Sequence, residues 1–138
     1  MPREAAFDRS RSIDLHVASL AHTDERAVGG VTSGAIGLGE EVTWRARHFG
    51  LRWRMTSRIT ESDRPHRFVD EQVRGPFRWF RHVHRFEPGA AGETVMIDEV
   101  AFAAPLGPLG RMVEPVLGPY VRRLIERRNV HLAASDEA

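Results

Sequence analysis

The chain has 138 residues, of which 41% are hydrophobic and 28% charged, and its formal net charge at pH 7 is +1. These values are typical of an ordinary globular protein and exclude a disordered chain. The sequence contains no cysteine, which excludes disulfides, cysteine nucleophiles and cysteine-bound zinc or iron–sulfur centres.

The sequence shows no clear pattern of a signal peptide, a membrane span or a nucleic-acid-binding surface. Residues 1–8 lack the apolar segment of a signal peptide, and no run approaches the eighteen or so apolar residues of a membrane span. Arginines alternate with acidic residues along the whole chain, which is typical of a solvated surface and not of a nucleic-acid interface. We therefore expect a cytoplasmic protein with no membrane span and no nucleic-acid partner.

Residues 2–20 are expected to form two short helices. Pro2 suits a first helical turn, and Ser12 or Asp14 would cap the second helix. The glycine-rich stretch Gly29–Gly39 follows. It is unlike a phosphate loop, because no Gly-Lys-Ser/Thr follows it and no parallel strand precedes it. The composition predicts a mobile loop or a bulged strand.

From Glu41 to Ala103 the hydrophobic period changes to two, which is the pattern of strands with one covered face. Short turns rich in glycine and proline separate the alternating runs, so consecutive strands should pair antiparallel. We expect five strands, at residues 41–48, 51–60, 67–74, 77–87 and 93–103.

The last segment, from about Pro108 to Leu132, is predicted to be one long amphipathic helix, because its apolar residues recur at three- and four-residue spacing. Pro115 and Pro119 should bend or interrupt it near the middle. The residues expected to face the sheet are Val116, Leu117, Tyr120, Val121 and Leu124, and those assigned to a solvated face are Arg122, Arg123, Arg127 and Arg128.

Several short segments along the chain resemble the START-like (SRPBCC) superfamily. They are Phe7-Asp8 to Asp14-Leu15-His16, Gly39 to Trp44, Phe68-Val69-Asp70-Glu71-Gln72 before Gly75-Pro76-Phe77, His82-Val83-His84-Arg85-Phe86, and Asp98 to Phe102 running into Pro105-Leu106-Gly107-Pro108-Leu109-Gly110. The resemblance implies one α+β domain over residues 1–138 with the helix-grip fold. In that fold a curved antiparallel sheet surrounds a long C-terminal helix and a cavity for a small, mostly apolar ligand.

The beginning of the chain departs from the family pattern. Family members start with a strand before the first helix, and here residues 2–7 already look like the segment that follows it. A missing strand would leave unpaired backbone at a sheet edge, which invites pairing. We expect either the stretch Ala27–Ile36 or a second copy of the chain to occupy that edge, and therefore a possible homodimer.

Residues 77–87 carry the clearest candidate site. Phe80, His82, His84 and Phe86 share one face of this strand, because alternate residues of a strand point the same way. If that face points inward, both histidines project into the cavity. Asp98, on the neighbouring strand, is the nearest candidate partner for the buried imidazoles.

The cavity wall should be mostly apolar with a few fixed donors and acceptors, as in other ligand pockets. Both kinds of side chain occur at inward positions of the predicted strands and helix. The predicted ligand-binding residues are Trp44, His48, Trp53, Met55, Asp70, Gln72, Phe80, His82, His84, Asp98, Phe102 and Tyr120.

Three roles remain open for the histidines and carboxylates. They could satisfy one another in the core, contact a ligand, or take part in metal binding or catalysis. His82 and His84 with Asp98 could ligate zinc. Either imidazole paired with Asp98 could act as a general base in a reaction of the polyketide cyclase or dehydratase type.

Binding needs only the cavity, whereas an enzyme also needs a base placed against a reacting carbon. We therefore expect binding or carriage of a small apolar, lipid- or polyketide-like molecule, with no cofactor, no metal and no catalytic residue. A cyclase or dehydratase that uses the His/Asp cluster is the alternative.

Overall fold

An antiparallel sheet organises the described chain, which comprises residues 1–104 and 107–134 of a computed structural model. The helices are α1 (Arg3–Ser10), α2 (Ile13–Ser19) and α3 (Gly110–Ala134), with 3-10 turns at Ala21–Thr23, Ala90–Gly92 and Gly107–Leu109. The strands are β1 (Arg26–Gly30), β2 (Glu41–His48), β3 (Leu51–Asp63), β4 (Arg67–Arg74), β5 (Trp79–Pro88) and β6 (Thr94–Ala103). The six strands of this sheet pair in sequence order.

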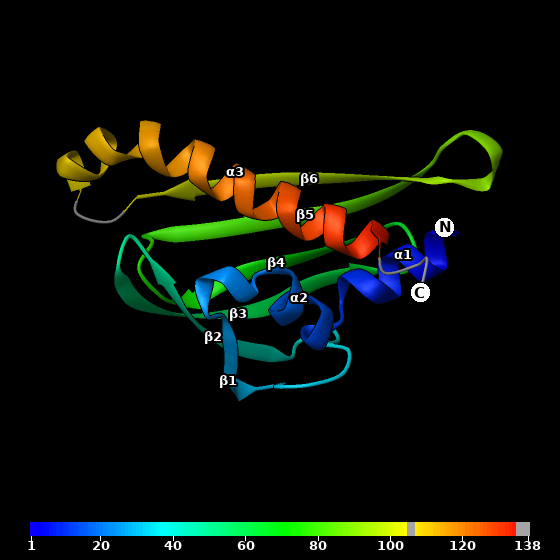
Figure 1. Ribbon diagram of the computed structural model, residues 1–138, viewed down its shortest axis with the longest axis horizontal. Helices are drawn as coiled ribbons and strands as arrows, with labels where there is room; N and C mark the ends of the chain where they lie inside the picture. The colour runs from blue at the N-terminus through cyan, green and yellow to red at the C-terminus, as the bar shows by residue number, and fades with distance from the viewer. Residues whose placement is uncertain (105–106, 135–138) are drawn as a thin grey trace.

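The predicted helix-grip fold is confirmed. Figure 1 shows the sheet curving around α3, with α1 and α2 beside the C-terminal half of that helix. The five predicted strands correspond to β2 through β6. The period-two alternation identified them because one face of each strand is covered. The link at Pro105-Leu106, part of the family resemblance, lies outside the described residues.

The two short helices form as predicted and supply one half of the core. Ser12 caps α2, and its Oγ accepts a hydrogen bond from the Leu15 amide at 3.2 Å. Phe7 of α1 is 1% exposed. Its ring meets those of Phe68 and Phe86 edge-on at centroid distances of 5.4 and 5.5 Å. This packing fixes α1 against the inner face of β4 and β5.

The start of the glycine-rich stretch forms a bulged strand, β1, which was missing from the five-strand prediction. It pairs with β2, and its register shifts between Ala27 and Gly29. Gly30 has φ +67°, and a side chain there would collide with the Glu41 backbone. The expectation that residues 27–36 would cover an edge holds at β2, through Arg26–Gly30. β6 still forms the opposite edge of the described sheet, and none of its residues is buried.

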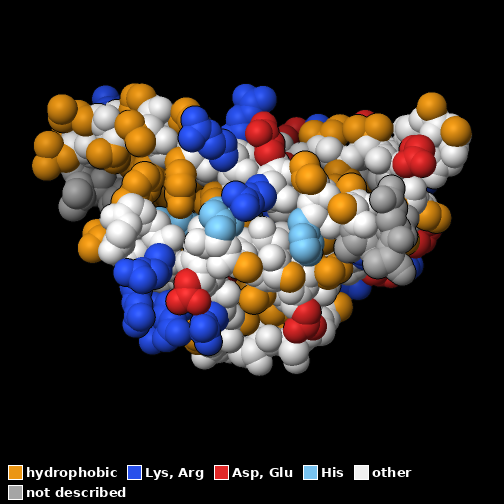
Figure 2. Space-filling view, in the orientation of Figure 1, with side chains coloured by type: hydrophobic (Ala, Val, Ile, Leu, Met, Phe, Trp, Pro, Cys, Tyr) orange, Lys and Arg blue, Asp and Glu red, His pale blue; other side chains and the backbone are white. Residues whose placement is uncertain are grey.

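The grip helix differs from its prediction in two ways. α3 continues through Pro115 and Pro119 without interruption; both prolines and Arg111 are exposed, so water can satisfy the carbonyls that they leave unbonded. Val116, predicted to face the sheet, is 61% exposed, because the first half of α3 projects past the sheet (Figures 1 and 2). No helix within the described ranges is both long and apolar enough to cross a bilayer.

Candidate functional site

A cavity of about 290 Å³ lies between the inner face of the sheet, α2 and α3. This volume is near the lower end of the range of roughly 300–1,000 Å³ found for ligand pockets. Most of its lining is apolar or aromatic. α3 contributes Leu117, Tyr120, Val121, Leu124, Ile125 and Arg128.

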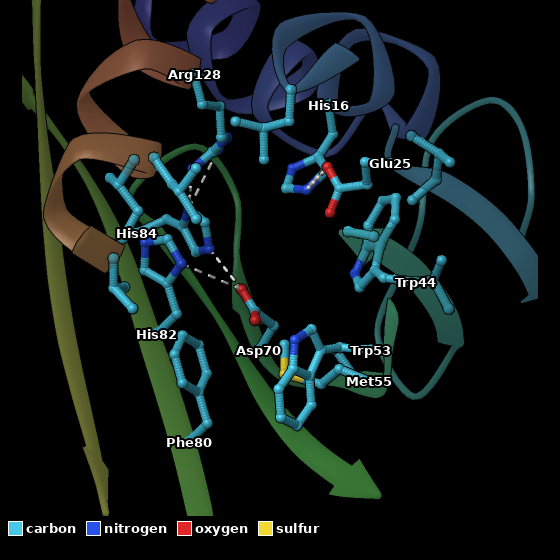
Figure 3. A pocket seen from close by; sticks show the side chains of 18 of the residues that line it. His16, Glu25, Trp44, Trp53, Met55, Asp70, Phe80, His82, His84 and Arg128 are labelled. Carbon is cyan, nitrogen blue, oxygen red and sulfur yellow. Dashed lines mark hydrogen bonds and ion pairs between the residues drawn. The ribbon is translucent and has the colours of Figure 1, made fainter. Parts of the chain in front are cut away.

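Aromatic and sulfur-containing side chains form the sheet side of the wall. Trp44, Trp53, Met55 and Phe80 line the cavity, and Figure 3 shows them spread around its interior. They reach it because alternate residues of β2, β3 and β5 point to the concave face. Such a wall offers large apolar area and flat surfaces for stacking.

A polar network interrupts this wall at β4 and β5. The His84 ring donates from Nε2 to Asp70 Oδ2 at 2.6 Å, and its Nδ1 lies 3.4 Å from both terminal nitrogens of Arg128. A guanidinium can only donate, so Nδ1 must be the acceptor and Nε2 must carry the proton. His84 is therefore held as one neutral tautomer.

The second histidine is tied to the strand behind it. His82 Nε2 lies 2.7 Å from Asp98 Oδ1, and its Nδ1 lies 3.8 Å from Asp70 Oδ2. The rings of His82 and His84 stack at a centroid distance of 3.7 Å. Asp98 also accepts a hydrogen bond from Asn129 of α3 and lies 3.6 Å from Arg128 Nη1. The network thus links β4, β5 and β6 to α3.

Burial and charge set the protonation of this network. Burial lowers the pKa of His84 to about 3, and His82 and Arg128 act in the same direction. Burial alone would raise the pKa of Asp70 and Asp98, but hydrogen bonds from the histidines and the positive charge of Arg128 bring both pKa values below their ordinary range. At neutral pH the network therefore holds two carboxylates, one guanidinium and a neutral His84.

The same residues are the candidate metal ligands. Ligand atoms of Asp70, His82 and His84 lie within 4.8 Å of one another. The Arg128 guanidinium lies 3.4 Å from the one unprotonated nitrogen of His84, where its positive charge would oppose a bound cation. The arrangement fits a self-contained hydrogen-bond network better than a metal site.

A separate contact joins α3 to β2 near the projecting end of the helix. The Tyr120 hydroxyl lies 2.6 Å from His48 Nδ1. Burial lowers the pKa of His48, with Glu25 opposing and His22 adding to the shift, so the ring favours its neutral form and Nδ1 can accept the hydroxyl proton. Burial raises the pKa of Tyr120, which keeps the donor protonated.

The third polar group on the cavity wall is the pair His16–Glu25. His16 Nε2 lies 3.1 Å from Glu25 Oε2, and the imidazole stacks on Trp44 at a centroid distance of 4.2 Å. His16 comes from α2, while Glu25 directly precedes β1. Figure 3 shows this pair across the cavity from His82, His84 and Asp70.

Most of the residues predicted from the sequence meet at this cavity. Those that line it are Trp44, His48, Trp53, Met55, Asp70, Phe80, His82, His84 and Tyr120. The other three do not. Asp98 lies behind the histidines, Gln72 bonds both backbone groups of Phe77 at the β4–β5 turn, and Phe102 packs beside Phe77 and Phe80.

Among the polar residues at the cavity that the prediction missed are Arg128, His16 and Glu25. Arg128 is 4% exposed, contrary to its assignment to the solvated face. Its spacing from Tyr120 and Leu124, four residues at each step, could have placed it on the inner face of the helix. Glu25 gave no comparable signal, because the structure of residues 21–40 could not be inferred from periodicity. His16 lies in a predicted helix, but its role depends on its contact with Glu25.

The comparisons with known proteins agree with the fold. Residues 15–136 match the family described as polyketide cyclase / dehydrase and lipid transport. The chain is similar to the structure of TTHA0849 from Thermus thermophilus, with TM-score 0.73 and 15% identity over 97% of this chain and 91% of that one. It is also similar to Ara h 8.0201, with TM-score 0.64 and 14% identity over the same shares. No curated protein matches the chain.

The network predicts a dependence of stability on pH. The pKa of an unfolded histidine is about 6.5, and that of His84 in the fold is about 3. Between these values the unfolded chain binds a proton that the folded chain does not. Stability should therefore fall as the pH falls from about 6.5, and His84 alone contributes up to roughly 1.4 kcal/mol per pH unit.

His84→Gln removes this titrating group, so its unfolding free energy should fall less steeply between about pH 6.5 and 4.5. The aspartates, whose pKa values are lowered, lose their contribution only near and below about pH 3.8. Urea unfolding of both proteins across the window measures the two slopes. Equal slopes would show that His84 is not held neutral.

Proposed function

The chain belongs to the polyketide cyclase / dehydrase and lipid transport family, and we propose that it binds a small, mostly apolar ligand in the cavity between its sheet and α3. The observation that carries the proposal is the composition of the wall: apolar and aromatic side chains surround a few polar groups, the largest of which is the network of Asp70, His82 and His84. Such a wall takes up an apolar body and leaves a few fixed groups to orient a polar end.

In this proposal Asp70 and His82 are the polar groups that meet the ligand, since both line the cavity. Asp98, itself bonded by Asn129, holds His82 from behind, and His84, which contacts Arg128, holds Asp70. The polar end of a ligand would therefore find donors and acceptors already fixed in direction, which lowers the entropy lost on binding.

The alternative is an enzyme of the cyclase or dehydratase type that uses the same cluster. A general base needs an accepting atom within hydrogen-bond reach of the substrate proton. Both ring nitrogens of His84 are engaged, by Asp70 and Arg128. His82 Nε2 bonds Asp98 at 2.7 Å, but its Nδ1 lies 3.8 Å from Asp70 Oδ2, which is beyond hydrogen-bond distance. This geometry disfavours His84 as a base and leaves His82 Nδ1 as the candidate, so the enzyme alternative depends on that nitrogen.

Filling the cavity should abolish binding. Ala46 lines the cavity and is 5% exposed, so Ala46→Phe would place a ring in the space that the ligand needs. We expect wild type to bind 2-naphthol in isothermal titration calorimetry. The variant should bind it at least roughly tenfold more weakly, because the ligand loses one well-packed apolar contact surface.

Val116→Phe is the matched control, because it adds the same ring at an exposed position of α3 that does not line the cavity. It should bind 2-naphthol like wild type. Thermal unfolding of all three proteins establishes that they are folded. Equal affinity of wild type and Ala46→Phe would show that the probe binds elsewhere and would contradict the proposal.

We also infer that the protein forms a homodimer through the outer edge of β6. This strand is ten residues long, forms an edge of the described sheet and contains no buried residue. A long unprotected edge is a template for pairing with another strand, and antiparallel pairing of two β6 strands would give a symmetric interface.

Val95→Lys tests this dimer, since Val95 is 48% exposed on β6 and a lysine on an edge strand opposes pairing. In sedimentation velocity at micromolar concentration, wild type should be dimeric and the variant monomeric. A monomeric wild type would contradict the inference.

A further inference from the structure

We propose that the His16–Glu25 pair is a second polar anchor of the cavity, so that the site selects uncharged molecules with hydrogen-bond donors at two opposite ends. The inference rests on the proposed function, because it concerns the ligand of the same cavity. It adds which molecules the cavity accepts and which it rejects.

Glu25 is a buried carboxyl group with an incomplete set of partners. Its side chain is 8% exposed and lines the cavity. Oε2 faces His16 Nε2 at 3.1 Å, but within the described chain it meets no donor at hydrogen-bonding geometry. Figure 3 shows the other carboxyl oxygen directed into the cavity.

A buried carboxyl group without donors destabilises a fold, so such groups are normally hydrogen-bonded. The stacking of His16 on Trp44 holds the imidazole in place beside Glu25. A hydroxyl group on a ligand could donate to the oxygen that points into the cavity. A hydrogen bond to a charged group is about twice as strong as one between neutral groups.

The opposite wall also presents a carboxylate. Asp70 lines the cavity and uses Oδ2 for His84, which leaves its second oxygen for a ligand donor. Figure 3 shows Asp70 and Glu25 on opposite sides, with Trp44 and Trp53 on the wall between them. The space between the two acceptors is thus bounded by aromatic rings, which suits a flat ring system.

The charges of the cavity work against an anionic ligand. Two guanidinium groups line the cavity, but Arg128 is paired with Asp98 and Arg11 with Asp8, whereas the carboxylate of Asp70 lines the cavity itself. Glu25 adds a further carboxyl group at the other end. A carboxylate on the ligand would therefore meet a like charge at either anchor, which disfavours binding. The lining favours diols over fatty acids of similar size.

Three naphthalenes test the inference at constant ring size. 2,6-Dihydroxynaphthalene carries donors at both ends, 2-naphthol carries one, and 6-hydroxy-2-naphthoic acid replaces one hydroxyl by a carboxylate. Calorimetry with wild type at about pH 7 should show the diol binding roughly tenfold more tightly than 2-naphthol, the effect of one added charge-assisted hydrogen bond. The acid should bind more weakly than the diol by at least a similar factor.

Glu25→Gln keeps the shape of the side chain and removes its charge. In this variant the advantage of the diol over 2-naphthol should shrink to within about threefold. The exposed Glu87→Gln is the matched control, and it should keep the full advantage. If thermal unfolding shows that Glu25→Gln is not folded, the order of affinities of the three probes for wild type tests the second anchor.

The outcomes separate the two proposals. If wild type binds the diol and 2-naphthol equally tightly, the second anchor is wrong while the proposed cavity function stands. The second anchor is also wrong if the acid binds as well as the diol, or if folded Glu25→Gln keeps the full advantage. If none of the three probes binds, the inference and the proposed function are both contradicted.

Discussion

The buried guanidinium of Arg128 is the interaction on which this structure depends most. It is 4% exposed and reaches from α3 to Asp98 and His84 on the sheet. Loss of one partner from a buried charge network leaves the remaining charges uncompensated, which destabilises a fold by about 3–5 kcal/mol. At the other end of the cavity the Tyr120–His48 hydrogen bond also joins α3 to the sheet. The helix is therefore fixed at both ends of the cavity without side chains that fill the space between.

The network that fastens the helix also gives the cavity its polarity. Because Arg128 occupies the accepting nitrogen of His84 and Asp70 takes its proton, the imidazole cannot turn toward a ligand without breaking two contacts. Two carboxylates remain ionised beside it because hydrogen bonds and the guanidinium lower their pKa values. A histidine held in this way is suited to orienting a ligand, whereas general-base catalysis needs a free accepting atom, for which His82 Nδ1 is the candidate in this network.

The sequence predicted the sheet and half of the site because both follow from strict alternation. Once Phe80 and Phe86 were placed inside, His82 and His84 had to follow, and the structure places them so. Val116 and Arg128 were assigned to the wrong faces because helical periodicity does not show where the sheet ends beneath the helix. The role of Glu25 depends on the short, bulged strand β1. Its position arises from tertiary packing, which no local pattern encodes.

Native mass spectrometry of the gently purified protein, beside a His82→Asn variant, tests the central claim most directly. We expect wild type to carry a small molecule, and any molecule carried by the variant to have the same mass. An empty wild-type cavity would contradict binding. A ligand whose mass differs between the two proteins, for example by one water, would show that His82 takes part in a conversion and that the protein is an enzyme.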